Sequence, residues 1–314
     1  TTVRVAQGAT YQLNSSDTVA SIEGAGNITS GAVTGAVVTL TVSGNTTPFS
    51  GVIGDGSAGG RLALTKVGSD TLTLSGLNTY TGATNINAGT LLLSEGGYRS
   101  PSFNIATGAV LRLHTDSSWL DYGTNTTFTG TGTLLKTGFG TALWGTTAAT
   151  FAMGAGGLID VQAGSFIGGS SSNENWTNNL ASLNVAARAV FLTVEADVRV
   201  DALTGAGAVQ MGHGSSANAG LTVGVNNFVA GIYNTSAGSA TFSGTLFDFG
   251  RLIKAGTGTL TLSGNNVHTG ATTVQAGTLR LGVDQAFSAN SALTLNPGAT
   301  FDLNGKRQSL VSVV

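Results

Sequence analysis

The chain has 314 residues and a formal net charge of −2, and only 9% of its residues are charged. A hydrophobic content of 41% is enough to bury a core, which excludes a disordered chain. The 13 basic residues form no run that would neutralise a row of phosphates, so we expect no nucleic-acid partner. The absence of cysteine excludes disulfides and thiolate metal sites, and we expect neither a metal nor any other cofactor.

The N-terminal residues, TTVRVAQGATYQLN, contain no basic segment followed by an apolar one, so we expect no signal peptide here. Short bursts follow in which apolar residues alternate with Thr, as Leu40 and Val42 do with Thr39 and Thr41. Alternation with a period of two predicts half-buried β-strands. Gly, Asn-Gly or Ser-Gly closes nearly every burst and supplies the turns. Since no stretch shows sustained helical periodicity, we expect almost no helix.

Residues 54–59, GDGSAG, satisfy the pattern G-x-G-x-x-G. A dinucleotide site would need a helix after this pattern and an acidic residue about twenty positions on. Instead, residues 62–65 alternate as a strand, so the sequence predicts a turn and no bound nucleotide.

Residues 64–93 and 252–281 are two copies of one sequence, with nineteen of thirty positions identical at a constant offset of 188. Shorter phrases recur about every 20–25 residues. A unit of this size buries its apolar face only by stacking on its neighbours, which predicts a parallel β-helix of about 14 coils. The alternative, a blade-repeat propeller, would need about 40 residues in each blade.

Lys66, Lys136 and Lys254 occupy the same place in three copies, the one at residue 136 being degenerate. They mark either a ligand-binding stripe or solvated side chains on one outer face. Because burying a lysine without a partner is costly, we expect them to be exposed.

Two segments, near residues 97–128 and 168–179, interrupt the repeats. Loops on a rigid scaffold commonly carry recognition, and exposed aromatic side chains among polar ones suit contacts with sugars or proteins. Trp119, Asp121, Tyr122 and Trp176 are therefore the candidate ligand-binding residues. The alternative is that the tryptophans only fill or cap a coil.

Glu195, Asp197, Arg199 and Asp201 alternate with apolar residues, which predicts four charges on one strand face. Some parallel β-helix enzymes cleave polysaccharides with carboxylates arranged in this way. The alternative is a solvated outer face on which the arginine is the internal partner of the acids, and the unbroken apolar alternation favours it.

Three histidines occur, at positions 114, 213 and 268. His114 lies near Asp116 and Asp121, so the sequence leaves a catalytic triad open. Exposed loop histidines are the expected interpretation.

The motif at residues 64–91, LTKVGSDTLTLSGLNTYTGATNINAGTL, resembles the passenger-associated transport repeat of type V autotransporters of Gram-negative bacteria. The second copy departs from it at Val267 and His268, where Thr79 and Tyr80 stand in the first. The resemblance implies a right-handed β-helical passenger that is displayed on the cell surface or secreted. In that family the repeat is thought to assist folding and export.

We expect no counterpart of the family's C-terminal membrane barrel in these 314 residues. We therefore expect residues 1–314 to form a single β-helical passenger fragment, with membrane contact only through the missing barrel. Adhesion, self-association or biofilm formation is the expected function, without catalysis. The expected partner is a host-cell surface protein or glycan, or another copy of the chain. The alternatives are a polysaccharide-cleaving enzyme and the β-helical domain of a secreted toxin.

Overall fold

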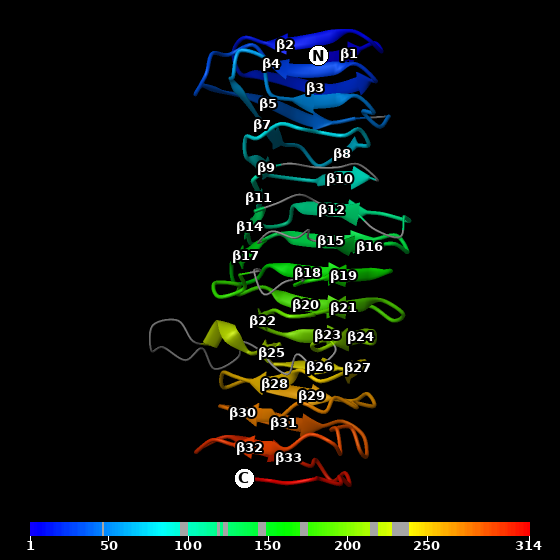
Figure 1. The fold of residues 1–314 in the computed structure, drawn as a ribbon, viewed down its shortest axis with the longest axis vertical. Coiled ribbons are helices and arrows are strands. Elements are labelled where there is room, and N and C mark those ends of the chain that lie inside the picture. The colour runs from blue at the N-terminus through cyan, green and yellow to red at the C-terminus, as the bar shows by residue number, and fades with distance from the viewer. Residues whose placement is uncertain are drawn as a thin grey trace. The chain divides into compact units, whose positions relative to one another are not determined.

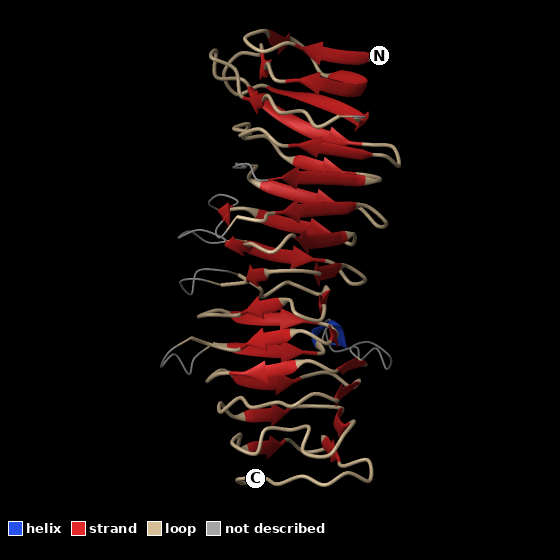
Figure 2. Ribbon diagram, turned by 90° about the vertical axis from the view of Figure 1, so that its right-hand side faces the viewer, coloured by secondary structure: helices blue, strands red, loops and turns tan. Residues whose placement is uncertain are grey.

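The computed structural model describes residues 1–45, 47–94, 100–117, 120–121, 125–143, 149–169, 175–213, 219–227 and 239–314. Its contacts divide the chain into two compact units, Thr1–Thr150 and Phe151–Val314. Strands dominate both units (Figure 2), and the one helix in the described residues is the single 3-10 turn η1, Val225–Asn227. No described helix is both long enough and apolar enough to cross a membrane.

The strands of the first unit are short, and most have three to six residues. They are β1 (Thr2–Val5), β2 (Thr10–Leu13), β3 (Asp17–Gly24), β4 (Asn27–Ser30), β5 (Val37–Gly44), β6 (Val52–Gly54), β7 (Arg61–Lys66), β8 (Thr71–Leu74), β9 (Thr84–Ile86), β10 (Thr90–Ser94), β11 (Ser102–Ile105), β12 (Val110–His114), β13 (Leu120–Asp121), β14 (Thr127–Gly130), β15 (Thr133–Thr137) and β16 (Thr141–Leu143).

Strands from successive passes of the chain lie beside one another in parallel. One stack has the order β1-β3-β5-β7-β9-β11-β14 and another the order β8-β10-β12-β15, with β2-β4-β6 and β13-β16 as smaller stacks. Neighbours in a stack are roughly 20 residues apart in sequence, as Leu72 is from its register partner Leu91. This is the arrangement of a parallel β-solenoid.

The second unit is built in the same way (Figure 1). Its strands are β17 (Thr150–Met153), which begins at the last residue of the first unit, β18 (Leu158–Val161), β19 (Ser165–Ile167), β20 (Ser182–Val185), β21 (Val190–Leu192), β22 (Asp197–Val200), β23 (Leu203–Gly205), β24 (Ala208–Gln210), β25 (Gly220–Val223), β26 (Ala240–Phe242), β27 (Thr245–Phe247), β28 (Arg251–Lys254), β29 (Thr259–Leu262), β30 (Thr272–Val274), β31 (Thr278–Leu281), β32 (Leu293–Leu295) and β33 (Thr300–Asp302).

From β18 on, the strands of this unit form three parallel stacks: β18-β20-β23-β26-β29-β31-β33, β19-β21-β24-β27 and β22-β25-β28-β30-β32. The predicted all-β solenoid class is therefore confirmed. The number of turns, about 11 over the described residues, is slightly lower than the predicted 14 coils. The predicted number assumes that every coil has the same number of residues. In the structure, not every pass of the chain adds a strand to the longest stack.

The core of each unit consists of apolar ladders made by the inward positions of the alternation. In the first unit Leu72, Leu91, Leu111 and Leu134 are register partners across β8, β10, β12 and β15, and all are fully buried. Parallel register places like residues above one another, so each turn covers the apolar side chains that its neighbour would expose.

Aromatic residues extend these ladders. Phe103 and Phe128 are register partners with rings stacked at 5.6 Å, and in the second unit Phe166 and Phe191 stack at 5.7 Å.

Small residues form a further column where turns approach most closely. A Cβ placed on Gly51 would overlap the carbonyl oxygen of Gly26, and one on Gly76 would overlap that of Gly51. The second unit repeats this column with Gly207, Gly244 and Gly264. Backbone thus packs on backbone at one corner of each unit, which only glycine permits.

Candidate functional site

The three repeated lysines are buried, so the expectation that they are solvated is wrong. Lys66, Lys136 and Lys254 are 0%, 1% and 0% exposed. Each takes an inward place in an apolar ladder, as Lys66 does between its register partners Val42 and Ile86. The alternation that makes Leu62 and Leu64 inward residues carries Lys66 inward as well.

Backbone carbonyls hold the buried ammonium groups. Lys66 Nζ donates to the carbonyl oxygens of Val67 at 2.5 Å, Gly68 at 2.8 Å and Ala88 at 3.2 Å. An ammonium has three donors and no acceptor, so its hydrogen-bonding capacity is used completely. These bonds offset the cost of burial and pair carbonyls at the strand end that would otherwise lack a donor.

The second copy reproduces the same device. Lys254 Nζ donates to Ala255 at 2.5 Å, Gly256 at 2.9 Å and Ala276 at 3.3 Å. Burial lowers the pKa of Lys254 to about 8, against the opposing effect of Asp201, and also lowers the pKa of Lys66. Neither amine reaches the surface, so these lysines are structural and do not form a ligand-binding stripe.

A buried asparagine is a second device shared by the two copies. Asn78 Oδ1 accepts the backbone N–H of Ile53 at 3.0 Å, while its Nδ2 donates to Gly76 at 2.9 Å. Asn266 repeats this with Leu246 N at 2.7 Å and with Gly264 at 3.2 Å. Each side chain substitutes for a backbone partner where the strand ladder is interrupted.

The third shared device is a chain of hydroxyl groups. Tyr80 Oη lies 2.7 Å from Thr84 Oγ1, which donates to Ser100 Oγ at 2.9 Å. In the second copy His268 Nε2 lies 2.9 Å from Thr272 Oγ1, which lies 2.9 Å from Ser291 Oγ.

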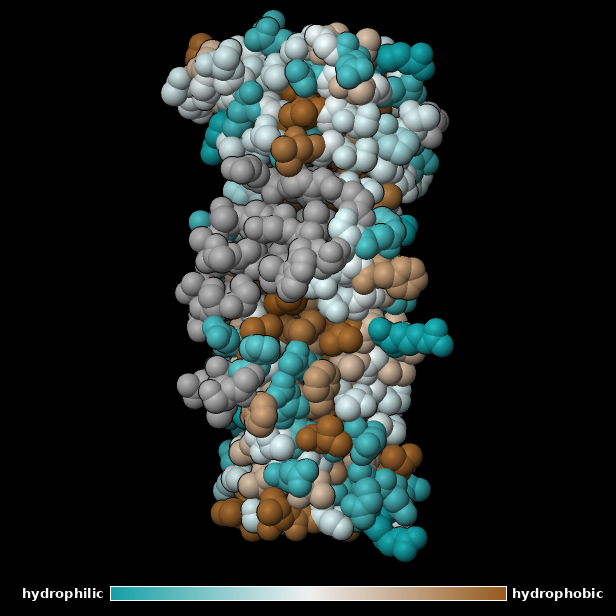
Figure 3. All heavy atoms as spheres, turned by 45° about the vertical axis from the view of Figure 1, so that its right-hand side comes forward, coloured by the Kyte–Doolittle hydropathy of each residue, from teal (hydrophilic) through white to brown (hydrophobic). Residues whose placement is uncertain are grey.

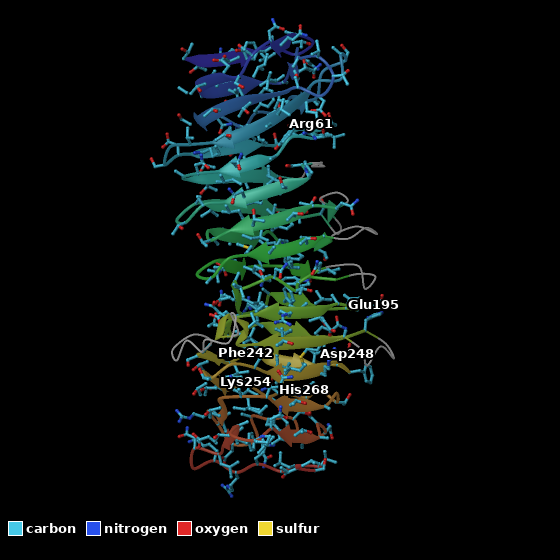
Figure 4. All side chains as sticks on the ribbon, turned by 90° about the vertical axis from the view of Figure 1, so that its left-hand side faces the viewer. Arg61, Glu195, Phe242, Asp248, Lys254 and His268 are labelled. Atoms are coloured by element: carbon cyan, nitrogen blue, oxygen red, sulfur yellow. The ribbon has the colours of Figure 1, made fainter. Side chains whose placement is uncertain are left out.

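The two rings at the head of this chain differ in how they titrate. Burial lowers the pKa of His268 to about 4, while burial raises the pKa of Tyr80 to about 12. His268 Nδ1 has no hydrogen-bond partner among the described residues. Figure 4 shows Lys254 and His268 within the strand stack of the second unit, whereas Glu195 lies at its margin.

The predicted ligand-binding residues have different outcomes. Trp119 and Tyr122 lie outside the described residues, and only the backbone of Asp121 is described, in β13 beside β16. Trp176 is 1% exposed, so the exposed aromatic expected at this position is instead a core residue. Its ring stacks on Phe151 at 3.9 Å and its Nε1 donates to the carbonyl of Gly168 at 2.8 Å. A binding role for Trp119, Asp121 and Tyr122 stays a prediction.

A cluster of polar side chains lies on the outward face of the first unit, at the ends of β12 and β15. His114 Nδ1 is 3.1 Å from Thr137 Oγ1 and His114 Nε2 is 3.3 Å from Asp116 Oδ2, while Arg112 Nε donates to the same threonine at 2.9 Å. The backbone N–H of Phe139, followed by the charge of His114, lowers the pKa of the Asp116 carboxyl.

This order of groups is formally that of a hydroxyl, histidine and carboxylate triad. However, the hydroxyl of Thr137 already accepts a hydrogen bond from the Arg112 guanidinium. Beside the cluster Phe139 is 87% exposed. An open polar cluster next to an exposed ring suits a contact surface better than a catalytic site.

The face of the molecule shown in Figure 3 is mixed in polarity. In the view of Figure 3 the hydrophobic atoms form several groups with hydrophilic atoms between them. Such a mixed surface is typical of protein contact regions as well as of ordinary surface, so it does not by itself define a site.

The predicted row of four charges on one strand is wrong. Strand β22 begins only at Asp197, because Glu195 lies in a turn in which Val194 has a φ of 50°, and Asp201 follows the strand end. Asp197 is paired with Arg251 through two bonds of 2.7 Å. The partner of this acid is therefore an arginine on another turn and not Arg199, as the solvated-face interpretation had it.

Asp55, in the G-x-G-x-x-G segment, is structural. Its carboxylate accepts the backbone N–H groups of Leu62 at 2.8 Å and Thr81 at 3.1 Å. The segment links β6 to β7 without a helix, so the predicted turn is confirmed.

The chain contains two repeats, each with a buried lysine, within a parallel solenoid. These features indicate the class of protein to which the chain is related. The model of the passenger-associated-transport-repeat family matches residues 64–93 and 252–281. The buried lysine, asparagine and hydroxyl chain are therefore what two of these repeats have in common structurally.

One curated relative carries the comparison further. The chain is 29% identical over 280 residues to the adhesin BmaC autotransporter of Brucella suis biovar 1 (strain 1330). The match covers 82% of this chain and 8% of the relative, so the chain spans less than a tenth of that protein's length. Together the repeats and this similarity support an autotransporter passenger domain. No solved structure matches the chain.

Proposed function

We propose that this chain is part of a bacterial adhesin that acts at the cell surface or after secretion, by binding a host-cell surface protein or glycan or a second copy of itself. The observation that carries the proposal is the similarity to a named autotransporter adhesin over 82% of the chain. The two matched repeats support export to the surface.

The structure supports different roles for the inward and the outward residues of the chain. The characteristic polar residues of the repeats, such as Lys66, Asn78 and His268, point inward and take part in folding. Contacts with a partner therefore fall to the outward strand faces and loops. In the first unit the proposed contact surface is the His114 cluster with Phe139, together with Trp119, Asp121 and Tyr122.

Display of the chain on a non-aggregating bacterium tests this proposal. Residues 1–314, fused to an unrelated outer-membrane anchor, are expected to increase clumping, biofilm formation or attachment to cultured host cells several-fold over the anchor alone. Display confirmed by antibody labelling, with no gain in any of the three, would refute it.

We further propose that the chain is not an enzyme. Asp197, one of the acids considered for polysaccharide cleavage, is held by Arg251 through two bonds of 2.7 Å, so its carboxylate is engaged in an ion pair and not free to act on a glycosidic bond. A screen of polysaccharides for newly released reducing ends decides the point. Release by the wild-type chain that Asp197→Asn abolishes would overturn this part of the proposal.

A further inference from the structure

The guanidinium of Arg199 has no hydrogen-bond or ion-pair partner among the described residues of the second unit. It is half-buried on β22, and its Nε is shielded from water yet has no hydrogen-bond partner among the described residues. Its carbonyl oxygen accepts Asn179 Nδ2 at 2.8 Å, but no acid of the described chain pairs with its side chain. A buried donor that makes no hydrogen bond is costly, so such a group points to a missing acceptor.

The Arg199 side chain lines a cavity of about 230 Å³ on the outward face of β22, β25 and β28. Its register partner Thr222 is in turn the register partner of Ile253, so three different chemical groups follow one another along the turns. The residues that line the cavity are Arg199, Thr222, Val225, Ile253, Ala255 and Gln275.

The polar groups of the cavity are all available for a ligand. The hydroxyl of Thr222 and the amide of Gln275, like the guanidinium of Arg199, make no side-chain hydrogen bond within the part of the chain that the structure describes. The remaining wall is apolar: Val225 of η1, Ile253 and Ala255. A few polar groups that converge over an apolar wall are typical of a small-molecule site.

The charges around the cavity favour an anion. Asp197, two residues from Arg199, is neutralised by Arg251, and Asp201 accepts the backbone N–H of Asn226 at 3.3 Å. Lys254 lies buried below the same strands. With both nearby acids engaged, Arg199 retains the charge and the fork of donors that bind a carboxylate through two parallel bonds.

We infer that this cavity, termed the Arg199 pocket, binds one carboxylate-bearing sugar residue, either a uronic acid or a sialic acid at the end of a glycan. The carboxylate lies against Arg199, hydroxyl groups of the ring bond to Thr222 and Gln275, and the C–H face of the ring packs on Ile253. The volume is below the roughly 300–1,000 Å³ of pockets for drug-sized ligands, which fits a single ring.

An acidic side chain of a peptide offers the same carboxylate. It carries no hydroxyl groups, however, so the donors and acceptors of Thr222 and Gln275 would lose water without gaining partners. The pocket therefore favours the saccharide. This inference deepens the proposed adhesive function and rests on it for its role in the cell.

Binding of soluble sugars to the purified 314-residue chain tests the inference apart from adhesion. The probes are sialyllactose and a glucuronic acid disaccharide, each against its uncharged counterpart, lactose or the glucose disaccharide, measured by calorimetry or by ligand-observed NMR. One of the two acidic sugars is expected to bind, and which one it is tells whether the pocket takes a sialic acid or a uronic acid. The neutral sugars are expected to bind at least tenfold more weakly.

Three variants assign the binding to the pocket. Arg199→Gln is expected to lose at least tenfold in affinity, and Arg199→Lys, which keeps the charge but loses the fork, is expected to lose less. Arg188→Gln, an exposed arginine of the same unit, is the matched control and should bind like wild type. Circular dichroism confirms that each variant is folded, and Thr222→Val provides a second pocket variant if Arg199→Gln does not fold.

Three results would each overturn the inference. They are equal binding by wild type and a folded Arg199→Gln, equal binding of acidic and neutral sugars, and binding of an acidic peptide in place of both sugars. A chain that binds the sugar through Arg199 but does not promote attachment would contradict the adhesive function while leaving the pocket intact.

Discussion

At the scale of single residues, the buried lysines of the first and second repeat explain why the motif carries a charged residue among leucines. Three backbone carbonyls converge on Lys66 Nζ, and no apolar side chain can satisfy them. Lys66→Met keeps the volume and removes the donors, so we expect the free energy of unfolding to fall by about 1–3 kcal/mol.

Arg61→Met on the same strand is the control for this measurement, since Arg61 is exposed. Urea denaturation of both variants checks the prediction. If the two variants were equally stable, the carbonyl cage would contribute nothing to folding.

His268 makes stability depend on pH. Its pKa is about 4 in the folded protein and about 6.5 when unfolded, so between these values the unfolded chain binds more protons. The stabilisation is complete above pH 6.5 and is lost as the pH falls toward 4, by on the order of 3 kcal/mol in total.

His268→Tyr, which installs the ring present at Tyr80, is expected to remove this component of the pH dependence. His213→Tyr, at an exposed histidine, is the matched control and should keep it. Unfolding measured at pH 7 and pH 4.5 decides the matter, and an unchanged pH dependence in His268→Tyr would contradict the assignment.

The burial of the lysines could have been predicted from the sequence. Alternation placed Leu62 and Leu64 inward and, continued by one step, places Lys66 inward too. The general cost of burying a charge argues against this local pattern, but the backbone carbonyls around Lys66 Nζ offset that cost. What the sequence could not show is the third carbonyl, from Ala88 on the following turn, because that contact exists only after the turns stack.

At the scale of elements, the solenoid depends on corners at which turns touch through backbone alone. Gly51 lies between Gly26 and Gly76 in such a column, and a methyl group there would overlap the carbonyl oxygen of Gly26. We expect Gly51→Ala to destabilise the first unit by about 1–3 kcal/mol, because the overlap forces the turns apart.

The comparison for this variant is Gly108→Ala, which has open space around the new methyl group and only the strain of its φ of 78°. Thermal unfolding of the two variants ranks them. A Gly108→Ala variant less stable than Gly51→Ala would contradict the role assigned to the column.

Trp176 is an anchor of the core in the second unit. It stacks on Phe151 and meets Phe191 edge-on at a centroid distance of 6.1 Å. Trp176→Ala is expected to lower the free energy of unfolding by about 3–5 kcal/mol, as large aromatic truncations in cores do. A folded variant of wild-type stability would instead restore the surface role that the sequence suggested.

Strand positions and the solenoid class followed from alternation and from glycine-closed turns, because both are local properties of the chain. The long-range pairs were beyond such patterns. Arg251, for example, is 54 residues from its partner Asp197, and it reaches that partner across Gly220, whose missing side chain leaves the path open. The Arg199 pocket depends on the same stacking of turns and had no signal in the sequence.

At the scale of the whole molecule, the residues shared by the repeats and the proposed binding sites are separate. The residues that identify the passenger repeats are inside, where they satisfy backbone groups and order the turns. The outward faces differ from turn to turn and carry the His114 cluster and the Arg199 pocket. Such an arrangement allows the inward residues of the repeats to stay constant while the outward surfaces vary.

The most direct test of this account is attachment of beads coated with the purified, folded chain to host cells and to one another. We predict several-fold more attachment or clustering than with beads that carry the same amount of heat-denatured chain. Equal attachment by folded and denatured chain, or none by either, would contradict the claim that the folded solenoid is an adhesive domain.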